Sequence, residues 1–212
     1  MDPWLIVVAV AALAALVWWL FRPSAKAEPR ALRAASGSVT RLAERGLEAL
    51  PLGLRLSPRD DAVAERFDFP PFGRGAERAA TEVVRGTVDG VEVLAFRYSF
   101  VLEGEDSPRQ YDITALGTRF PWTGRLRLAS LPREPGVTPG FADAWRVDEE
   151  PPGLGLITER LREILMDARL KASAVVVQPD AVVLVDTVRR TPPDLVEDLM
   201  LLKSIRDALR AA

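Results

Sequence analysis

The densest groups of carboxylates in this chain lie in two short runs. Glu103-Gly104-Glu105-Asp106 and Asp148-Glu149-Glu150 have the side chains that could bind a cation or supply a general acid and base. The first run lacks the stepped acidic spacing of a calcium loop. We therefore expect the first run to be a solvated connection between two strands, and the second to be a solvated loop before a helix.

Other chemistry is limited by the residue types present. The chain has no histidine and no cysteine, which excludes a Ser-His-Asp or Cys-His site, a thiolate nucleophile and an ordinary zinc site. Phe72-Gly73-Arg74-Gly75 has no following Lys-Ser or Lys-Thr pair, so we expect a turn rather than a phosphate cradle. Arg97, Tyr98 and Tyr111 could form a polar spot on a sheet, but cross-strand packing is the preferred interpretation. We predict no catalytic, cofactor-binding or metal-binding residues and no enzymatic activity, with a carboxylate-only hydrolase as a distant alternative.

The run Trp4–Phe21, WLIVVAVAALAALVWWLF, has no charged side chain. As a helix, its roughly 18 residues would reach about 27 Å, close to the hydrocarbon thickness of a bilayer. Tryptophans stand near both ends, where indole rings favour the headgroup region. We predict a transmembrane anchor over residues 1–21, in preference to a buried core helix or a secretory signal cleaved near Ala25-Lys26-Ala27.

Charge around this run predicts its orientation. Only Met1-Asp2-Pro3 precede it, whereas Arg22, Lys26, Arg30 and Arg33 follow it. Basic residues beside a span tend to stay in the cytoplasm, so we expect a single-pass protein of the plasma membrane with its soluble domain in the cytoplasm. The whole chain has 28 basic and 30 acidic residues, a balance that predicts no nucleic-acid partner.

Beyond the anchor, composition divides the chain in two. Residues 22–38 are rich in Ala, Ser, Pro and Arg without an apolar period, which is typical of a flexible linker. Residues 39–212 are long enough for one soluble domain. We expect this domain to begin with a helix over Val39–Leu50, a strand over Leu52–Leu56, and a helical turn that starts at Ser57-Pro58 and ends at Phe67.

The clearest predicted strand pair is Thr81–Val88 with Val91–Leu102. Asp89-Gly90 between them suits the positive φ angles of a type I′ turn. Apolar side chains alternate along the second arm and should face the core: Leu94, Phe96, Tyr98, Phe100 and Leu102. Further strands of a meander are expected over Gln110–Gly117 and Arg125–Ser130.

The C-terminal half predicts helices around a second hairpin. A short strand is expected over Ala144–Val147, and an apolar stripe predicts a helix over Ile157–Ala168. Ala174–Val177 and Ala181–Thr187 should form a hairpin, and Thr191-Pro192-Pro193-Asp194 should start a long closing helix. Because the strands are grouped rather than alternating with helices, we predict an α+β fold with an antiparallel sheet packed against helices.

Loose aromatic and glycine motifs recur in a familiar order along the domain. They are Phe72-Gly73-Arg74-Gly75, Arg85-Gly86, Phe96-Arg97-Tyr98-Ser99 and the segment Phe141–Val147 with Trp145-Arg146-Val147. In this order the chain resembles a family of uncharacterised, membrane-anchored bacterial proteins, in which a domain of unknown function follows one N-terminal span. The resemblance covers about residues 40–210, and Ala144 stands where the family pattern has a bulky polar residue. It implies a shared fold and no particular activity.

Two functions remain after these exclusions. The first is a membrane-tethered, non-catalytic interaction or scaffold domain that holds a protein partner at the bacterial plasma membrane. The alternative is a small apolar-ligand or lipid-binding module, because an antiparallel sheet under a long helix can leave a pocket and the anchor would keep it near lipid.

Overall fold

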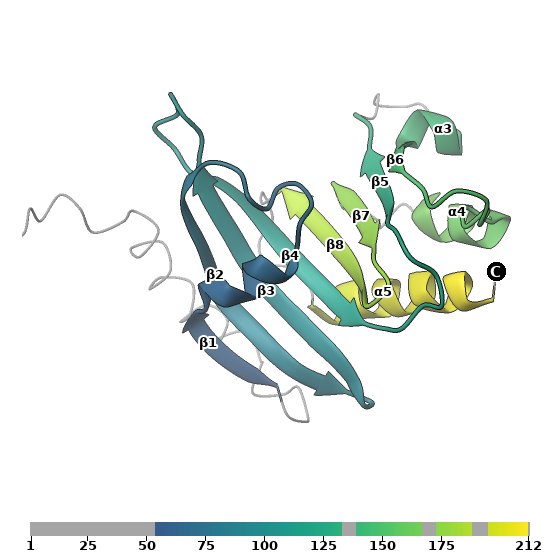
Figure 1. Cartoon of the computed structure of the whole chain (residues 1–212), viewed down its shortest axis with the longest axis horizontal. Helices are drawn as coiled ribbons and strands as arrows, with labels where there is room; N and C mark the ends of the chain where they lie inside the picture. Colours follow the sequence, from purple (N-terminus) through teal and green to yellow (C-terminus); the bar gives the residue numbers. More distant parts are fainter. Residues whose placement is uncertain (1–53, 133–138, 167–172, 188–194, 212) are drawn as a thin grey trace, which may run out of the picture.

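The computed structural model describes residues 54–132, 139–166, 173–187 and 195–211 (Figure 1). The predicted anchor (1–21), linker (22–38) and first helix (Val39–Leu50) lie outside these residues. Within the described ranges, no helix is long and apolar enough to cross a membrane.

The described strands form one eight-stranded sheet in the order β1-β2-β3-β4-β8-β7-β5-β6, with every neighbouring pair antiparallel. The strands are β1 (Arg55–Arg59), β2 (Ala76–Val88), β3 (Val91–Val101), β4 (Arg109–Gly117), β5 (Leu126–Ser130), β6 (Trp145–Glu149), β7 (Ala174–Val177) and β8 (Ala181–Thr187). The helices are the 3-10 helix η3 (Asp61–Arg66) and the α-helices α3 (Phe141–Ala144), α4 (Glu159–Met166) and α5 (Leu195–Arg210). The predicted antiparallel sheet with a closing helix is confirmed.

Both predicted hairpins are present. The β2–β3 turn has φ angles of 52° at Asp89 and 74° at Gly90, as a type I′ turn requires. The β7–β8 hairpin has the predicted bounds. The turn residues Asp89 and Gly90 therefore account for the first of these pairings.

The predicted meander is wrong beyond β4. Strand β4 pairs with β8, and β5 lies between β7 and β6. The reason is visible in β7 and β8, whose residues Ala174–Val177 and Ala181–Val185 are all buried. Strands that are apolar on both faces belong in the middle of a covered sheet, so this hairpin separates β4 from β5.

Two local predictions also need correction. Ser57 and Pro58 belong to β1 and do not start a helix; the helical turn begins at Asp61. Proline is tolerated there because β1 is an edge strand. Asp148 and Glu149 lie in β6 rather than in a loop before a helix, and α3 was not predicted.

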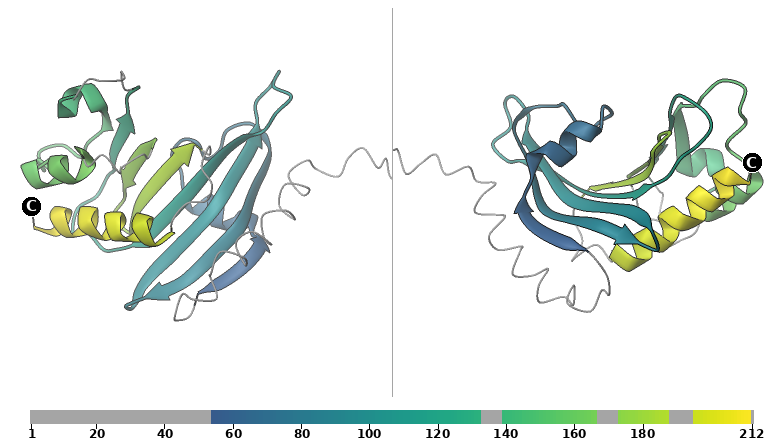
Figure 2. Two further views of the ribbon diagram at one scale, coloured as in Figure 1. Left: turned by 180° about the vertical axis from the view of Figure 1, so that it is seen from behind. Right: turned by 60° about the horizontal axis from the view of Figure 1, so that its bottom comes forward.

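The sheet buries apolar side chains on both faces. We call the face under α4 and α5 the back face and the opposite face, which carries η3, the front face. Figure 2 shows α5 lying across the back of the sheet, and the sheet curving between α5 on one side and η3 on the other. Successive side chains along a strand point to opposite faces, so one strand contributes apolar side chains to both faces of the sheet.

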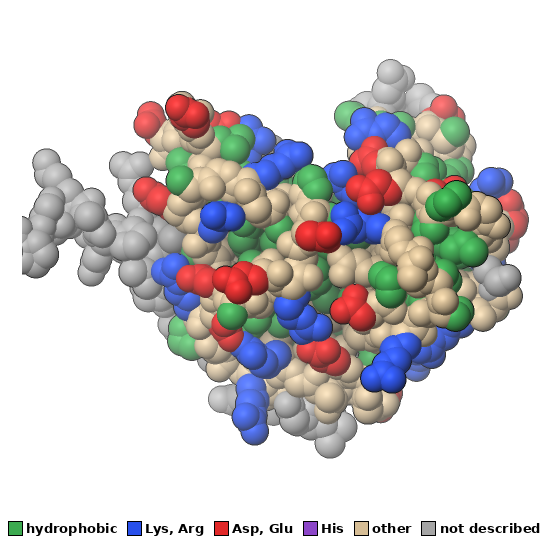
Figure 3. Space-filling model, in the orientation of Figure 1, with side chains coloured by type: hydrophobic (Ala, Val, Ile, Leu, Met, Phe, Trp, Pro, Cys, Tyr) green, Lys and Arg blue, Asp and Glu red, His purple; other side chains and the backbone are tan. Residues whose placement is uncertain are grey.

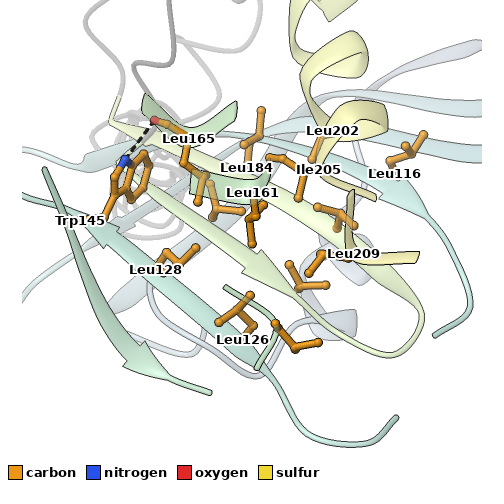
Figure 4. Close-up of a cluster of buried hydrophobic side chains, with 14 of the residues drawn as sticks. Leu116, Leu126, Leu128, Trp145, Leu161, Leu165, Leu184, Leu202, Ile205 and Leu209 are labelled. Carbon is orange, nitrogen blue, oxygen red and sulfur yellow. Dashed lines mark hydrogen bonds between the residues drawn. The ribbon is translucent and has the colours of Figure 1, made fainter. Parts of the chain in front are cut away.

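The back-face cluster is mainly aliphatic (Figure 4). Leu202, Ile205 and Leu209 of α5 meet strand residues such as Leu116 and Leu184. Trp145 of β6 adds an indole whose Nε1 donates to the carbonyl oxygen of Leu165 in α4, at 3.0 Å. This bond satisfies the only polar atom of a buried ring and ties β6 to α4.

Candidate functional site

The first acidic run lies where the sequence predicted it, in the connection between β3 and β4. Glu105 accepts from Nε and Nη2 of Arg109, both of them exposed residues, and this hydrogen bond lowers the pKa of Glu105. Among the described residues, no group of three or more acidic side chains is arranged to hold a metal ion.

The second acidic run is part of an ion-pair network on the front face of β5 and β6. Asp148 pairs with Arg146 at 2.6 Å and with Arg127 at 3.4 Å. The hydrogen bond from Arg146 lowers the pKa of Asp148. Glu149 lies 3.6 Å from Arg125, so these carboxylates are neutralised by arginine rather than free to bind a cation.

The predicted polar spot divides between the two faces of the sheet. Tyr98 lies opposite Tyr111 on the front face, buried among aromatic rings, and burial raises the pKa of its phenol. Packing is therefore its role, as expected. Arg97 faces the other way and donates to Asp112 of β4 and Glu82 of β2, both at 3.0 Å.

This Arg97 network was missed by sequence reasoning. Glu82 has a positive φ of 55° at an irregularity in the β2–β3 register, and its side chain is only 11% exposed. Burial raises the pKa of Asp112, the positive charge of Arg97 opposes that rise, and Glu82 adds to it. One arginine thus holds two carboxylates from neighbouring strands, which positions the strands but offers no evident substrate site.

The most distinctive front-face feature is the connection between β1 and β2. We call residues 61–75 the strap; it consists of η3 and an irregular loop (Figure 1). The loop carries Phe67, Phe69 and Phe72, none of them more than 6% exposed. Among the described residues, no backbone-to-backbone hydrogen bond joins positions 67–74 to the sheet. The strap is therefore held over the sheet by side chains.

The strap rings lie on aromatic side chains of β3. The ring centroids of Phe72 and Tyr98 are 4.8 Å apart, and Phe67 stacks on Phe96 at 6.1 Å. The contacts continue along the strand from Tyr98 to Phe100, 5.8 Å apart. The result is a continuous aromatic layer on one half of the front face.

Exposed ion pairs fasten the two sides of the strap. Arg66 of η3 donates to both carboxylate oxygens of Glu92 in β3, at 2.6 and 3.3 Å. Asp68 pairs with Arg125, whose guanidinium also lies 5.3 Å from the centroid of the Phe69 ring. Exposed ion pairs contribute about 0–1 kcal/mol each, whereas full burial of a phenylalanine is worth about 1.5–3 kcal/mol. The phenyl rings therefore dominate the strap's hold on the sheet.

Gly75 allows the strap to join β2 tightly. Its φ is +64°, and an added Cβ would lie 2.4 Å from the carbonyl oxygen of Val101. Gly73 also has a positive φ, of +74°, but has open space around it. The glycines of Phe72-Gly73-Arg74-Gly75 thus serve the expected turn and, at Gly75, a close backbone approach.

A small pocket borders the strap beside the Arg66–Glu92 pair. Its volume is about 10 Å³, and its apolar lining includes Phe67, Leu94 and Ala115. This is room for about one water molecule. Figure 3 shows the front face hollowed between the strap side and the β5–β6 side, with charged side chains gathered around the hollow.

Comparison with known proteins gives one informative result. No protein-family model matches the chain, and no curated protein matches it. The fold is similar to a crystal structure of the mycobacterial trehalose monomycolate transport factor A, TtfA. The TM-score is 0.53 at 15% sequence identity, over 86% of this chain and 96% of that chain. At this identity the likeness shows a shared fold.

Proposed function

We propose that this chain is a non-catalytic accessory domain that residues 4–21 hold at the plasma membrane, where the domain binds a protein partner. The observation that carries the proposal is the fold shared with nearly the whole length of a trehalose monomycolate transport factor. The apolar run before the domain and the lack of His and Cys in the sequence agree with it. In this view the chain assists transport at the membrane and performs no reaction itself.

The test is proximity labelling from a tag after Ala212 on the full chain. We expect at least one partner protein to be labelled above a control that carries only residues 1–38 and the same tag. A second control replaces Leu161, which is fully buried on the back face, with aspartate to unfold the domain while keeping the anchor. Equal labelling by all three proteins would contradict a partner-binding role for the folded domain.

The proposed orientation has a separate test. The chain contains no cysteine, so Ala212→Cys gives a single reactive thiol. If the domain is cytoplasmic, a membrane-impermeant maleimide should label this thiol only after the cells are permeabilised. Labelling of intact cells would reverse the proposed topology.

A second candidate function is the binding of a lipid by the front face. It is favoured by the aromatic layer beneath the strap and by the lipid substrate in the name of the structural neighbour. Native mass spectrometry of the full chain released from detergent should then show a retained lipid. Protein without added mass under these conditions would count against lipid binding but not against partner binding.

A further inference from the structure

We propose that the strap's phenyl rings occupy a binding site for a linear acyl chain, and that binding displaces the strap from β3. This inference rests on the second candidate function, lipid binding. It goes further by naming the site, the part of the ligand that enters it and the segment that moves.

The site follows from the spacing of rings along β3. Phe96, Tyr98 and Phe100 stand at every second residue, so they form a row that advances about 6.8 Å per ring. Phe100 stacks on Tyr111 of β4 with ring centroids 5.9 Å apart, which extends the row sideways onto the next strand. A straight apolar track of this kind matches an extended hydrocarbon chain better than a compact ligand.

The strap covers this track, and it is attached to the sheet differently from a core helix or strand. Phe67 and Phe72 touch the track directly, and Phe69 touches those two rings in turn. Positions 67–74 make no backbone-to-backbone bond with the sheet among the described residues. The strap can therefore leave without breaking a strand ladder, and a hydrocarbon chain can replace its apolar contacts.

The polar end of the ligand is assigned to the arginine side of the strap. Arg125 lies over the ring of Phe69, the strap ring that does not touch the track itself. The Arg125 side chain is only 19% exposed. The Nε atoms of Arg125 and Arg127 are buried without a hydrogen-bond partner. When Asp68 moves away with the strap, Arg125 loses that carboxylate and can donate to oxygen atoms of a lipid head. The class of ligand is therefore a long acyl chain with an oxygen-rich head.

The experiment uses a reversible lock on the strap. In the full chain, Arg66→Cys and Glu92→Cys introduce the only thiols, and a bismaleimide with a reducible linker joins them across the span of the original ion pair. The protein is placed in phosphatidylglycerol vesicles that contain palmitic acid with a mid-chain diazirine. After irradiation, mass spectrometry measures the label on the peptides that contain Phe96, Tyr98 and Phe100.

We expect the β3 peptides to be labelled in the reduced protein. Locking should decrease this label about tenfold or more, because apparent affinity scales with the fraction of molecules in the competent conformation. A matched control joins Arg160→Cys to Glu163→Cys, an exposed ion pair of α4 on the other face, and should leave the label unchanged. Glu92→Gln, which only removes the Arg66 pair, should raise it by about two- to fivefold.

Equal labelling of locked and reduced protein would overturn the proposal, and so would unlabelled β3 peptides in the reduced protein. The peptide that contains residues 4–21 separates these failures from failure of the membrane tether. If that peptide is labelled while β3 is not, the anchor stands and the acyl-chain site is wrong. If neither is labelled, both the site and the tether are contradicted.

Discussion

The two faces of the sheet are closed by different means. On the back face, α5 places side chains at helical spacing onto strand residues, and Leu202 and Ile205 are fully buried there. On the front face, an irregular strap places rings such as Phe69 over the sheet, and Phe69 is equally buried. Side chains that are equally buried can therefore belong to segments that are attached to the sheet in different ways. A helix with satisfied backbone bonds and a loop pinned by side chains should respond differently when a contact is removed.

The largest expected effect comes from truncating one buried side chain on each face. Phe69→Ala should cost about 3–5 kcal/mol, and Leu202→Ala about 2–5 kcal/mol, because each leaves a cavity in a packed cluster. Urea denaturation of the full chain in detergent, followed by tryptophan fluorescence, measures both costs.

Amide hydrogen exchange then sharpens this comparison. Phe69→Ala should increase exchange in residues 61–75 before exchange rises in β8, whereas Leu202→Ala should increase exchange in both together. The same order of exchange in the two variants would show that the strap and the helix are attached with equal cooperativity.

The next effect tests how the strap joins β2. Gly75→Ala should lower the unfolding free energy by more than about 1–2 kcal/mol, because it combines a positive φ with a clash against the Val101 carbonyl. Gly73→Ala is the matched control: it has the same sign of φ and open space, so it should cost only the left-handed backbone penalty of about 1–2 kcal/mol. Thermal denaturation of both variants measures the difference. Equal costs would mean that the close approach at Gly75 relaxes easily.

A smaller effect is expected from the indole bond on the back face. Trp145→Phe keeps most of the apolar surface but removes the donor to the Leu165 carbonyl. Loss of this hydrogen bond should cost about 0.5–1.5 kcal/mol, and α4 should fray at that end. Hydrogen exchange in α4, compared with that in α5, measures the loss; unchanged protection of α4 would argue that another group satisfies the carbonyl.

Sequence patterns predicted the regular strands and the closing helix better than they predicted the strap. Period-two alternation identified the inward residues of β3, Asp89-Gly90 identified its turn, and the apolar stripe of α5 identified the closing helix. The strap has no period, and its rings depend on contacts with β3 and on Arg125, which is 57 residues from Asp68. A local sequence pattern cannot reveal a contact between residues so far apart in the chain. The same limit explains why the insertion of β7 and β8 between β4 and β5 was not predicted.

The smallest expected effect is the pH dependence of stability, where the two faces should differ in sign. Burial raises the pKa of Asp112 on the back face, so the folded state binds its proton more readily than the unfolded state does. Stability from this group should increase as pH falls from neutral towards the unfolded pKa of about 3.9. The pKa of Asp148 on the front face is lowered by its hydrogen bond from Arg146. Its stabilisation is present above the unfolded pKa and is lost as pH falls towards the folded one.

Asp112→Asn and Asp148→Asn should therefore change the slope of stability against pH in opposite directions. Urea denaturation of each variant over a series of pH values measures these slopes. Slopes that change in the same direction would show that one of the two carboxylates has a different environment in the folded chain.

The position of the strap in the sequence affects the order in which parts of the fold can form during synthesis. The strap directly precedes β2 and β3, so the rings and the strand that they cover emerge from the ribosome almost together. By contrast, β4 must wait for β8, and the back of these two strands stays uncovered until α5, the last helix described, has been made. Contacts between distant segments form slowly, so the newly made half-sheet is shielded on its aromatic side while its aliphatic side is still open to chaperones.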